Sequence, residues 1–276
     1  MDQPVSDVIS HAVAHIPYLS ETPWLFYLVE VLITSGIVRF LQEFIEQSRV
    51  SVFIEEFFCI LQLIILSHEN LVIQKAYGDL AFAVVLLLSC YLYGRTFRTG
   101  VFTNVAGNVH VYAFGNYWPW GEFVGHIVTQ LLASYCGYWY VRFVWAVAAT
   151  DAAHKGKLSD IQSCSSHIQI NTAAAVAVEM ALTFLFRLMI HRENRFRSGL
   201  VLVSLMAVAM TFAGWNLTGG YFNPSLAFSM EFNCSGHNHL QFFLVYFLGP
   251  IIAAFIVGKL GDKIWSFVPH FFEDHL

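Results

Sequence analysis

The fold is decided by residues 217–228, which read Leu-Thr-Gly-Gly-Tyr-Phe-Asn-Pro-Ser-Leu-Ala-Phe. A shorter copy at residues 99–106 reads Thr-Gly-Val-Phe-Thr-Asn-Val-Ala. Both stretches follow the pattern Thr-Gly-x-x-x-Asn-x-small, and their asparagines, Asn104 and Asn223, lie 119 residues apart. Self-similarity at a fixed period is the signature of an internal repeat. The sequence therefore predicts two related halves, each containing one asparagine-centred loop.

Each asparagine is followed by a short apolar stretch, at residues 105–115 and 224–232. Such a stretch is long enough for about two or three helical turns but too short to cross a bilayer. Asparagine is a favoured N-cap and proline a favoured first helical residue. The triplets Asn104-Val105-Ala106 and Asn223-Pro224-Ser225 therefore predict the starts of two half-helices that enter the membrane from opposite faces.

The composition indicates a membrane protein. The 276 residues are 57% apolar and only 12% charged, about half the charged fraction of an average soluble domain. With 14 Lys plus Arg residues and a net charge of −5, the chain has no basic surface for a nucleic-acid backbone, so no nucleic-acid partner is expected. Five cysteines without paired spacing predict neither a zinc module nor a disulfide framework, and no cofactor or metal is expected.

Seven stretches are apolar enough, or nearly so, to be membrane spans of roughly 20 residues. The basic residues that flank the last six fall on one side if those six alternate, which predicts a cytoplasmic location for both of their ends. The first stretch carries Glu30 and Arg39 and could instead lie along the membrane surface. The stretches are residues 24–41, 50–67, 79–95, 121–145, 171–190, 199–216 and 240–258.

Each half also carries one acidic residue within its first span, Glu56 and Glu179. Three spans per half place the two halves in opposite orientations, which is the inverted-repeat plan of many transport proteins. Each carboxylate is expected to accept hydrogen bonds from the non-helical backbone of its own half's loop, because that backbone lacks partners in lipid. A proton or cation site at these carboxylates is the functional alternative.

The two loops resemble those of the aquaporin family, which combines six spans with two half-helices bearing paired Asn-Pro-Ala motifs. The resemblance covers roughly residues 50–260 and includes the last span, where residues 241–250 read Gln-Phe-Phe-Leu-Val-Tyr-Phe-Leu-Gly-Pro. Within the family, the chain is most similar to the unorthodox branch called superaquaporins. Two features carry this similarity: the first motif is degenerate, and a cysteine, Cys234, lies nine residues beyond the second motif. The implied fold class is an all-α membrane protein: an aquaporin-like inverted repeat of six transmembrane helices plus two re-entrant half-helices, with an extra N-terminal apolar helix.

The sequence departs from the family at the residues that would form the selectivity filter. Leu226 stands where water channels place an arginine, and spacing from Asn223 assigns the other two positions to Gly220 and Thr211. These residues predict a wider and less polar constriction than a strict water filter has. Ser225 would add a hydroxyl near the centre of the pore.

The resemblance implies a passive channel for small uncharged solutes: water, glycerol-like polyols and hydrogen peroxide. One alternative is a membrane-structural or partner-binding protein that keeps the fold without flux, for example with a pore blocked by Phe102 or Phe222. An ion-coupled carrier using Glu56 and Glu179 is another alternative. An enzyme is not expected, because the 12 histidines are scattered and no catalytic constellation is recognisable.

The expected organisation also follows from the repeat and the resemblance. The family implies a homotetramer in membrane lipid, and the branch implies the endoplasmic reticulum or another internal membrane, with the plasma membrane left open. Cys164 and Cys234 both fall in outer loops, so a disulfide between them is an option that sequence leaves open. The segments are an N-terminal segment 1–49 with an apolar helix at about 24–41, a first channel repeat 50–145, a connecting outer loop 146–170, a second channel repeat 171–260 and a cytoplasmic tail 261–276.

Overall fold

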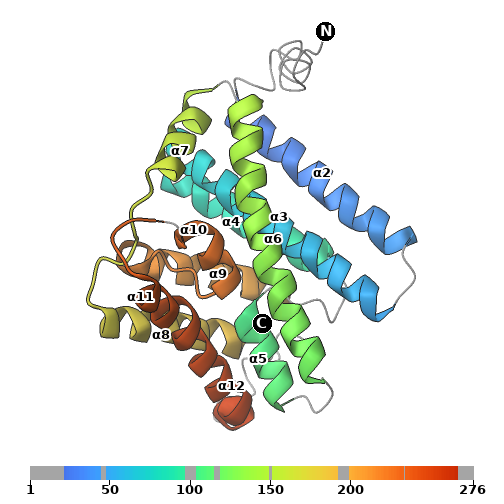
Figure 1. The fold of residues 1–276 in the computed structure, drawn as a ribbon, viewed down its shortest axis with the longest axis vertical. Helices are drawn as coiled ribbons and strands as arrows, with labels where there is room; N and C mark the ends of the chain where they lie inside the picture. The colour runs from blue at the N-terminus through green and yellow to red at the C-terminus, as the bar shows by residue number, and fades with distance from the viewer. Residues whose placement is uncertain are drawn as a thin grey trace.

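The computed structural model describes residues 22–44, 48–96, 104–114, 119–148, 151–191, 199–232 and 234–266. Three predicted segments lie outside this set: the first part of the loop at 99–103, which includes Phe102, the basic link at 192–198 and the end of the tail at 267–276. Nearly all described residues are helical (Figure 1). The helices are α2 (Pro23–Phe44), α3 (Arg49–Tyr77), α4 (Asp79–Thr96), α5 (Val105–Phe114), α6 (Trp120–Val147), α7 (Ala152–Gln162), α8 (Thr172–Ile190), α9 (Gly199–Thr218), α10 (Pro224–Glu231), α11 (His239–Phe243), the π-helical turn η2 (Leu244–Leu248) and α12 (Gly249–Ser266).

The same order of helices occurs twice, as the predicted fold class requires. Helices α3, α4, α5 and α6 form the first set, and α8, α9, α10 and the continuous run α11–η2–α12 form the second. In each set the third member is short, with 10 residues in α5 and 8 in α10, and so falls well below the length of a span. Figure 1 shows these two short helices in the middle of the bundle, with α10 above α5.

Six of the described helices are long and apolar enough to cross a membrane. They are α2, α3, α4, α8, α9 and the run from His239 to Ser266. Helix α6 has 28 residues and therefore the length to cross as well, although it is richer in His, Gln, Tyr and Trp. The predicted all-α membrane fold is confirmed, with α2 as the extra N-terminal helix.

Helix α2 runs along the bundle rather than across its surface. Near its start, the ring of Phe26 lies 4.6 Å from that of His154 on α7. Near its end, the Gln42 side-chain amide donates to Glu55 Oε1 at 2.5 Å and to the Thr96 carbonyl at 3.0 Å. The helix therefore lies antiparallel to α3 over most of its length. This arrangement favours the interpretation that α2 spans the membrane. It disfavours the alternative in which α2 lies along the membrane surface.

Helix α3 continues about ten residues beyond the predicted span 50–67. The continuation contains His68, Glu69 and Asn70, polar residues that resemble the end of a span in the sequence, but their exposed fractions are only 2%, 1% and 2%. They stay buried because other helices supply partners: the Trp145 indole donates to Glu69 at 2.6 Å, and the Ser89 hydroxyl donates to Asn70 at 3.3 Å. Long-range partners of this kind are not readable from hydropathy.

The predicted connecting loop 146–170 contains a helix, α7, that caps one side of the bundle (Figure 1). Asp151 is its N-cap and accepts from the backbone N–H groups of Ala153 and His154, both at 3.0 Å. The imidazole of His154 is fully buried, with Nδ1 2.5 Å from Asp151 Oδ2 and Nε2 3.1 Å from Glu69 Oε2. Burial lowers the pKa of His154, but the hydrogen bonds to Asp151 and Glu69 outweigh this effect and raise the pKa to about 9.

This cap predicts a pH dependence of stability. The pKa of His154 in the folded protein lies above its ordinary value of 6.5, so the stabilisation is complete below that value and is lost as the pH rises through about 9. We expect His154→Gln to lower the free energy of unfolding by about 1–3 kcal/mol at pH 6.5 and by less at pH 9.5. Thermal unfolding in detergent between these pH values measures the effect, with His239→Gln, at an exposed histidine, as the control. Parallel pH curves for the parent and His154→Gln would contradict it.

Candidate functional site: the junction of the two half-helices

Helix α10 begins at the asparagine that the sequence singles out. Asn223 has an extended backbone and its Oδ1 accepts from the Ser225 N–H at 3.0 Å, while Pro224 occupies the first turn. The preceding residue, Phe222, has a φ of 38°, a left-handed value that is uncommon outside glycine. This turn directs the chain from α9 back into the bundle, so that α10 starts deep inside the protein.

Helix α5 begins in the same way from the other half. Asn104 Oδ1 accepts from the Ala106 N–H at 2.9 Å, which repeats the cap of α10. Its amide nitrogen donates to the carbonyl of Phe222, the residue just before Asn223, at 3.0 Å. Asn104 and Asn223 are each 8% exposed. The structure therefore brings the N-terminal ends of the two half-helices together at a buried junction, and a side chain of one half binds the backbone of the other.

Glu179 of α8 supplies the acceptors that the second loop needs. It is fully buried and accepts from the Phe222 N–H at 2.7 Å, the Tyr221 N–H at 3.2 Å and the Thr218 hydroxyl at 2.6 Å. Without this carboxylate, two backbone N–H groups of the non-helical turn would be buried without partners, which costs about 1–3 kcal/mol each. Glu179 thus holds the turn that presents Phe222 to Asn104.

Glu56 of α3 is also fully buried, but its described partners lie on α6. The Gln130 amide donates to Glu56 at 2.5 Å and to Asn108 of α5 at 3.0 Å, and His126 Nδ1 contacts the same carboxylate. The first loop, which we expected Glu56 to support, lies outside the described residues. Glu56 therefore fixes α6 and, through Gln130, the first turns of α5.

Sequence reasoning missed His126, Gln130 and Asn108. The available signal was the four-residue spacing of His126, Gln130 and Ser134, which places three polar side chains on one face of a predicted span. All three are buried, with exposed fractions of 4%, 0% and 0%.

The Ser225 hydroxyl donates to Gln130 Oε1 at 2.8 Å, and Ser225 is 0% exposed. Its hydroxyl therefore joins the network of Glu56, Gln130 and Asn108, where it connects α10 to α6.

Of the three predicted filter residues, the structure brings two together. A side chain at Gly220 would lie 2.6 Å from the Thr211 carbonyl, and Gly220 has a φ of 63°, so only glycine fits this approach. Leu226 packs instead against the apolar cluster of Ile60, Ile64 and Ala133 between α3 and α6. The pairing of Gly220 with Thr211 depends on the same loop that Glu179 holds.

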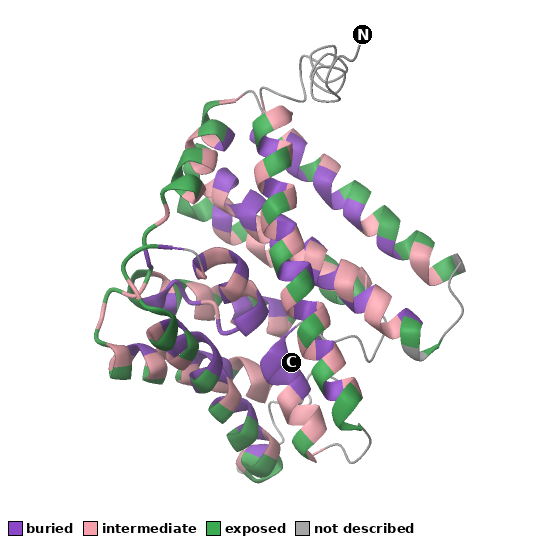
Figure 2. Cartoon of the chain, in the orientation of Figure 1, coloured by how far each residue is buried: buried purple, intermediate pink, exposed green. Residues whose placement is uncertain are grey.

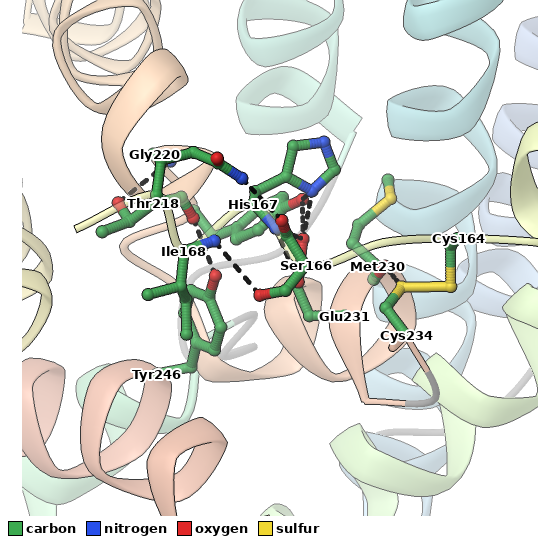
Figure 3. Close-up of polar contacts among 12 residues, drawn as sticks. Cys164, Ser166, His167, Ile168, Thr218, Gly220, Met230, Glu231, Cys234 and Tyr246 are labelled. Atoms are coloured by element: carbon green, nitrogen blue, oxygen red, sulfur yellow. Dashed lines mark hydrogen bonds and ion pairs between the residues drawn. A yellow bond between two sulfur atoms is a disulfide. The ribbon is translucent and has the colours of Figure 1, made fainter. Parts of the chain in front are cut away.

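A second group of polar contacts surrounds the far end of α10 (Figure 3). Cys164 and Cys234 form a disulfide with a Cα–Cα distance of 4.8 Å, which answers the question that the sequence left open. Beside it, the buried carboxylate of Glu231 accepts from the backbone N–H of His167 at 3.2 Å and from the Tyr221 hydroxyl at 3.0 Å, and also contacts the His167 ring. These contacts link α10, the loop before it and the segment between α7 and α8.

No cluster of three or more His, Cys, Asp or Glu side chains among the described residues is placed to hold a metal ion.

No protein-family model matches the chain. Individual relatives do match it over most of its length. It is 28% identical to aquaporin-11 of Milnesium tardigradum over 220 residues, which is 80% of this chain and 79% of the relative. Identity with aquaporin-11 of Equus caballus is 26% over 255 residues, 90% of both chains. A human protein called putative aquaporin-12A is 33% identical over 139 residues, 49% of this chain and 45% of its own.

The fold is similar to that of the aquaglyceroporin from Plasmodium falciparum, with a TM-score of 0.60 and 16% sequence identity, over 79% of this chain and 99% of that one. The repeat and the buried junction define an inverted-repeat membrane protein with two re-entrant half-helices. Together with the relatives, these features show that the chain is similar to the aquaporin family, in particular to its aquaporin-11 and aquaporin-12 branch. The family is one of membrane channels and not of enzymes.

The support of the turn by Glu179 is testable. In Glu179→Gln an amide N–H₂ replaces one acceptor, so at least one donor of the turn loses its partner, and we expect a loss of about 1–3 kcal/mol in the free energy of unfolding. Glu43→Gln makes the same chemical change at an exposed residue and should stay within about 0.5 kcal/mol of the parent. Chemical or thermal unfolding in detergent measures both variants. Equal stability of the parent and Glu179→Gln would show that the carboxylate does not hold the turn.

Proposed function

We propose that this protein is a passive channel for small uncharged solutes, with the junction of α5 and α10 at the centre of its pore. The observation that carries the proposal is the hydrogen bond from Asn104 to the Phe222 carbonyl, which sets two helix N-termini against each other inside the bundle. Each N-terminus carries a partial positive charge. Together they repel cations and protons, while neutral solutes that accept hydrogen bonds pass.

The proposed pore motifs are Asn104-Val105-Ala106 and Asn223-Pro224-Ser225, with Thr211, Gly220 and Leu226 as filter residues. No charged side chain stands at these three filter positions, which supports solutes larger than water. The candidates are water, glycerol-like polyols and hydrogen peroxide. We further propose a homotetramer in the endoplasmic reticulum or another internal membrane, which the resemblance to aquaporin-11 supports.

A channel fold without flux is the second candidate. Phe222 is buried, and its ring lies 4.9 Å from that of Phe186, while Phe82 of α4 packs its ring 5.2 Å from Trp215 of α9. Aromatic side chains between α4 and α9 could fill the path that solutes would need. In that case the protein would serve as a structural or partner-binding component of the membrane.

Flux measurements separate these two functions. Purified protein in liposomes is exposed to an osmotic step with water alone and with glycerol, and a trapped probe reports the entry of hydrogen peroxide. We expect at least one solute to cross several times faster than in empty vesicles, without dependence on a pH gradient. Rates equal to those of empty vesicles for all three solutes would contradict the channel function and favour the second candidate. A dependence on the pH gradient would favour a carrier.

The electrostatic part of the proposal has its own test in Asn223→Asp. Aspartate is also a good N-cap, so α10 should still form, but its negative charge opposes the two helix N-termini. We expect the variant to conduct small cations in planar bilayers, whereas the parent should not. Asn238→Asp, at the exposed N-cap of α11, carries the same change away from the junction and should behave like the parent. A folded Asn223→Asp protein with zero ionic current would refute the electrostatic account.

A further inference from the structure

Residues 164–170 form an outer strap that connects α7 to α8. One end of this strap is joined to the chain beyond α10 by the disulfide between Cys164 and Cys234. The backbone reinforces the connection: the Ser235 N–H donates to the Cys164 carbonyl at 3.0 Å, and the Ser166 N–H donates to the Ser235 carbonyl at 2.7 Å. The strap is therefore held to the C-terminal side of α10 by a covalent bond, by these two backbone hydrogen bonds and by the Ser235 hydroxyl, which donates to the Cys164 carbonyl at 3.1 Å.

The other end of the strap reaches the loop on the N-terminal side of α10. The Gln169 N–H donates to the Leu217 carbonyl at 3.0 Å. Between the two ends, Tyr221 and His167 both bind Glu231, and the Tyr221 hydroxyl lies 3.2 Å from His167 Nδ1. The strap thus connects both sides of the half-helix; Figure 3 shows its residues Cys164, Ser166 and His167 beside Glu231 and Cys234. Tyr221 directly follows the proposed filter residue Gly220 in the sequence.

Glu231 makes this connection sensitive to the position of the strap. It is fully buried in the last turn of α10, where the helix dipole disfavours a negative charge. Its described donors come from the strap, through His167, and from the loop, through Tyr221. If the strap lifts, the carboxylate loses the two donors of His167 and draws in water, and Tyr221 loses His167 as a neighbour.

We propose that the Cys164–Cys234 disulfide is a site of reversible thiol–disulfide exchange that regulates the proposed channel through the outer strap. The inference rests on the proposed function, because the regulated quantity is solute flux past the loop that carries Gly220. The oxidised protein holds strap, loop and α10 in one arrangement. In the reduced protein the strap is held to α10 by its hydrogen bonds alone and becomes more mobile, so that the loop loses part of its support on the outer side while Glu179 and Asn104 still hold it, and flux falls.

The surroundings of the disulfide suit this chemistry. Cys164 is partly exposed and lies between the exposed residues Ser163 and Ser165, whereas Cys234 is only 8% exposed. An external thiolate therefore attacks Cys164 Sγ, forms a mixed disulfide with it and releases Cys234 as the leaving thiolate, which takes up a proton. A second thiol then attacks the mixed disulfide, so that two external thiols become one disulfide and the protein gains two thiols.

The exchange is reversible because other contacts keep the two cysteines close. After reduction, the Cys234 thiol has an acceptor in the Met230 carbonyl, 3.2 Å from its sulfur. The paired backbone of Ser165 and Ser235 does not depend on the covalent bond, and the Cα–Cα distance of 4.8 Å lies within the range that a disulfide needs. Reoxidation by a small disulfide can therefore restore the bond.

The experiment compares redox states of the full chain in liposomes. Vesicles are treated with dithiothreitol, a dithiol that becomes a cyclic disulfide as it reduces the protein, and mass-tagged alkylation verifies the reduction. We expect permeability for the best-conducted solute to fall by about twofold or more, and oxidised glutathione to restore it. Hydrogen exchange of residues 164–170 and 219–222 should rise in the reduced state.

Variants identify the responsible cysteines, and the redox comparison of the parent protein keeps the test valid even if one variant fails to fold. Cys164→Ser with Cys234→Ser should conduct like the reduced parent and show no response to dithiothreitol, while Cys136→Ser, a free cysteine in α6, should respond like the parent. Equal flux and equal exchange in verified oxidised and reduced parent protein would overturn this inference and leave the channel function standing. Absence of flux in every state would overturn the channel function and this inference together.

Discussion

The structure depends on the need to satisfy non-helical backbone where lipid offers no partners. Between α9 and α10 the chain leaves its helical path inside the bundle, and this break leaves buried N–H and C=O groups without helical partners. In the second half, Glu179 accepts from two backbone N–H groups, and the side chain of Asn104 donates to the Phe222 carbonyl from the other half. Through this last hydrogen bond the first half satisfies a backbone carbonyl of the second half, so that the two halves are joined at the junction itself.

A polar framework extends from this junction through the apolar bundle. Gln130 joins three helices to its own by binding Glu56, Asn108 and Ser225. In Figure 2 the buried residues concentrate around the two half-helices, and exposed ones mark the outer faces of the long helices. Exposed apolar residues on those faces, such as Leu32 and Leu80, suit contact with lipid tails. The polar network around Gln130 thus lies inside the bundle, whereas apolar side chains cover much of the outer faces of the long helices.

Much of the fold was predictable from the sequence because the paired Thr-Gly-x-x-x-Asn pattern and the apolar stretches are local signals. The end of α3 was not predictable, since His68 and Glu69 look like residues outside the membrane unless Trp145 and His154 are known to pack against them. The partners of Glu56 were equally hidden, because they lie 70 and 74 residues away on α6. Cys164 and Cys234 were predictable only as two thiols on one side of the membrane, because it is the strap, through Ser166 and Ser235, that brings them together.

The contact between Asn104 and Phe222 carries the central claim, and a density map of the protein in lipid nanodiscs tests it most directly. Electron cryo-microscopy at a resolution that shows side chains should place Asn104 Nδ2 about 3.0 Å from the Phe222 carbonyl oxygen, with the starts of α5 and α10 facing each other at the middle of the lipid. A map in which Asn104 and Phe222 lie on separate sides of the protein, or at a turn in contact with bulk water, would contradict the account.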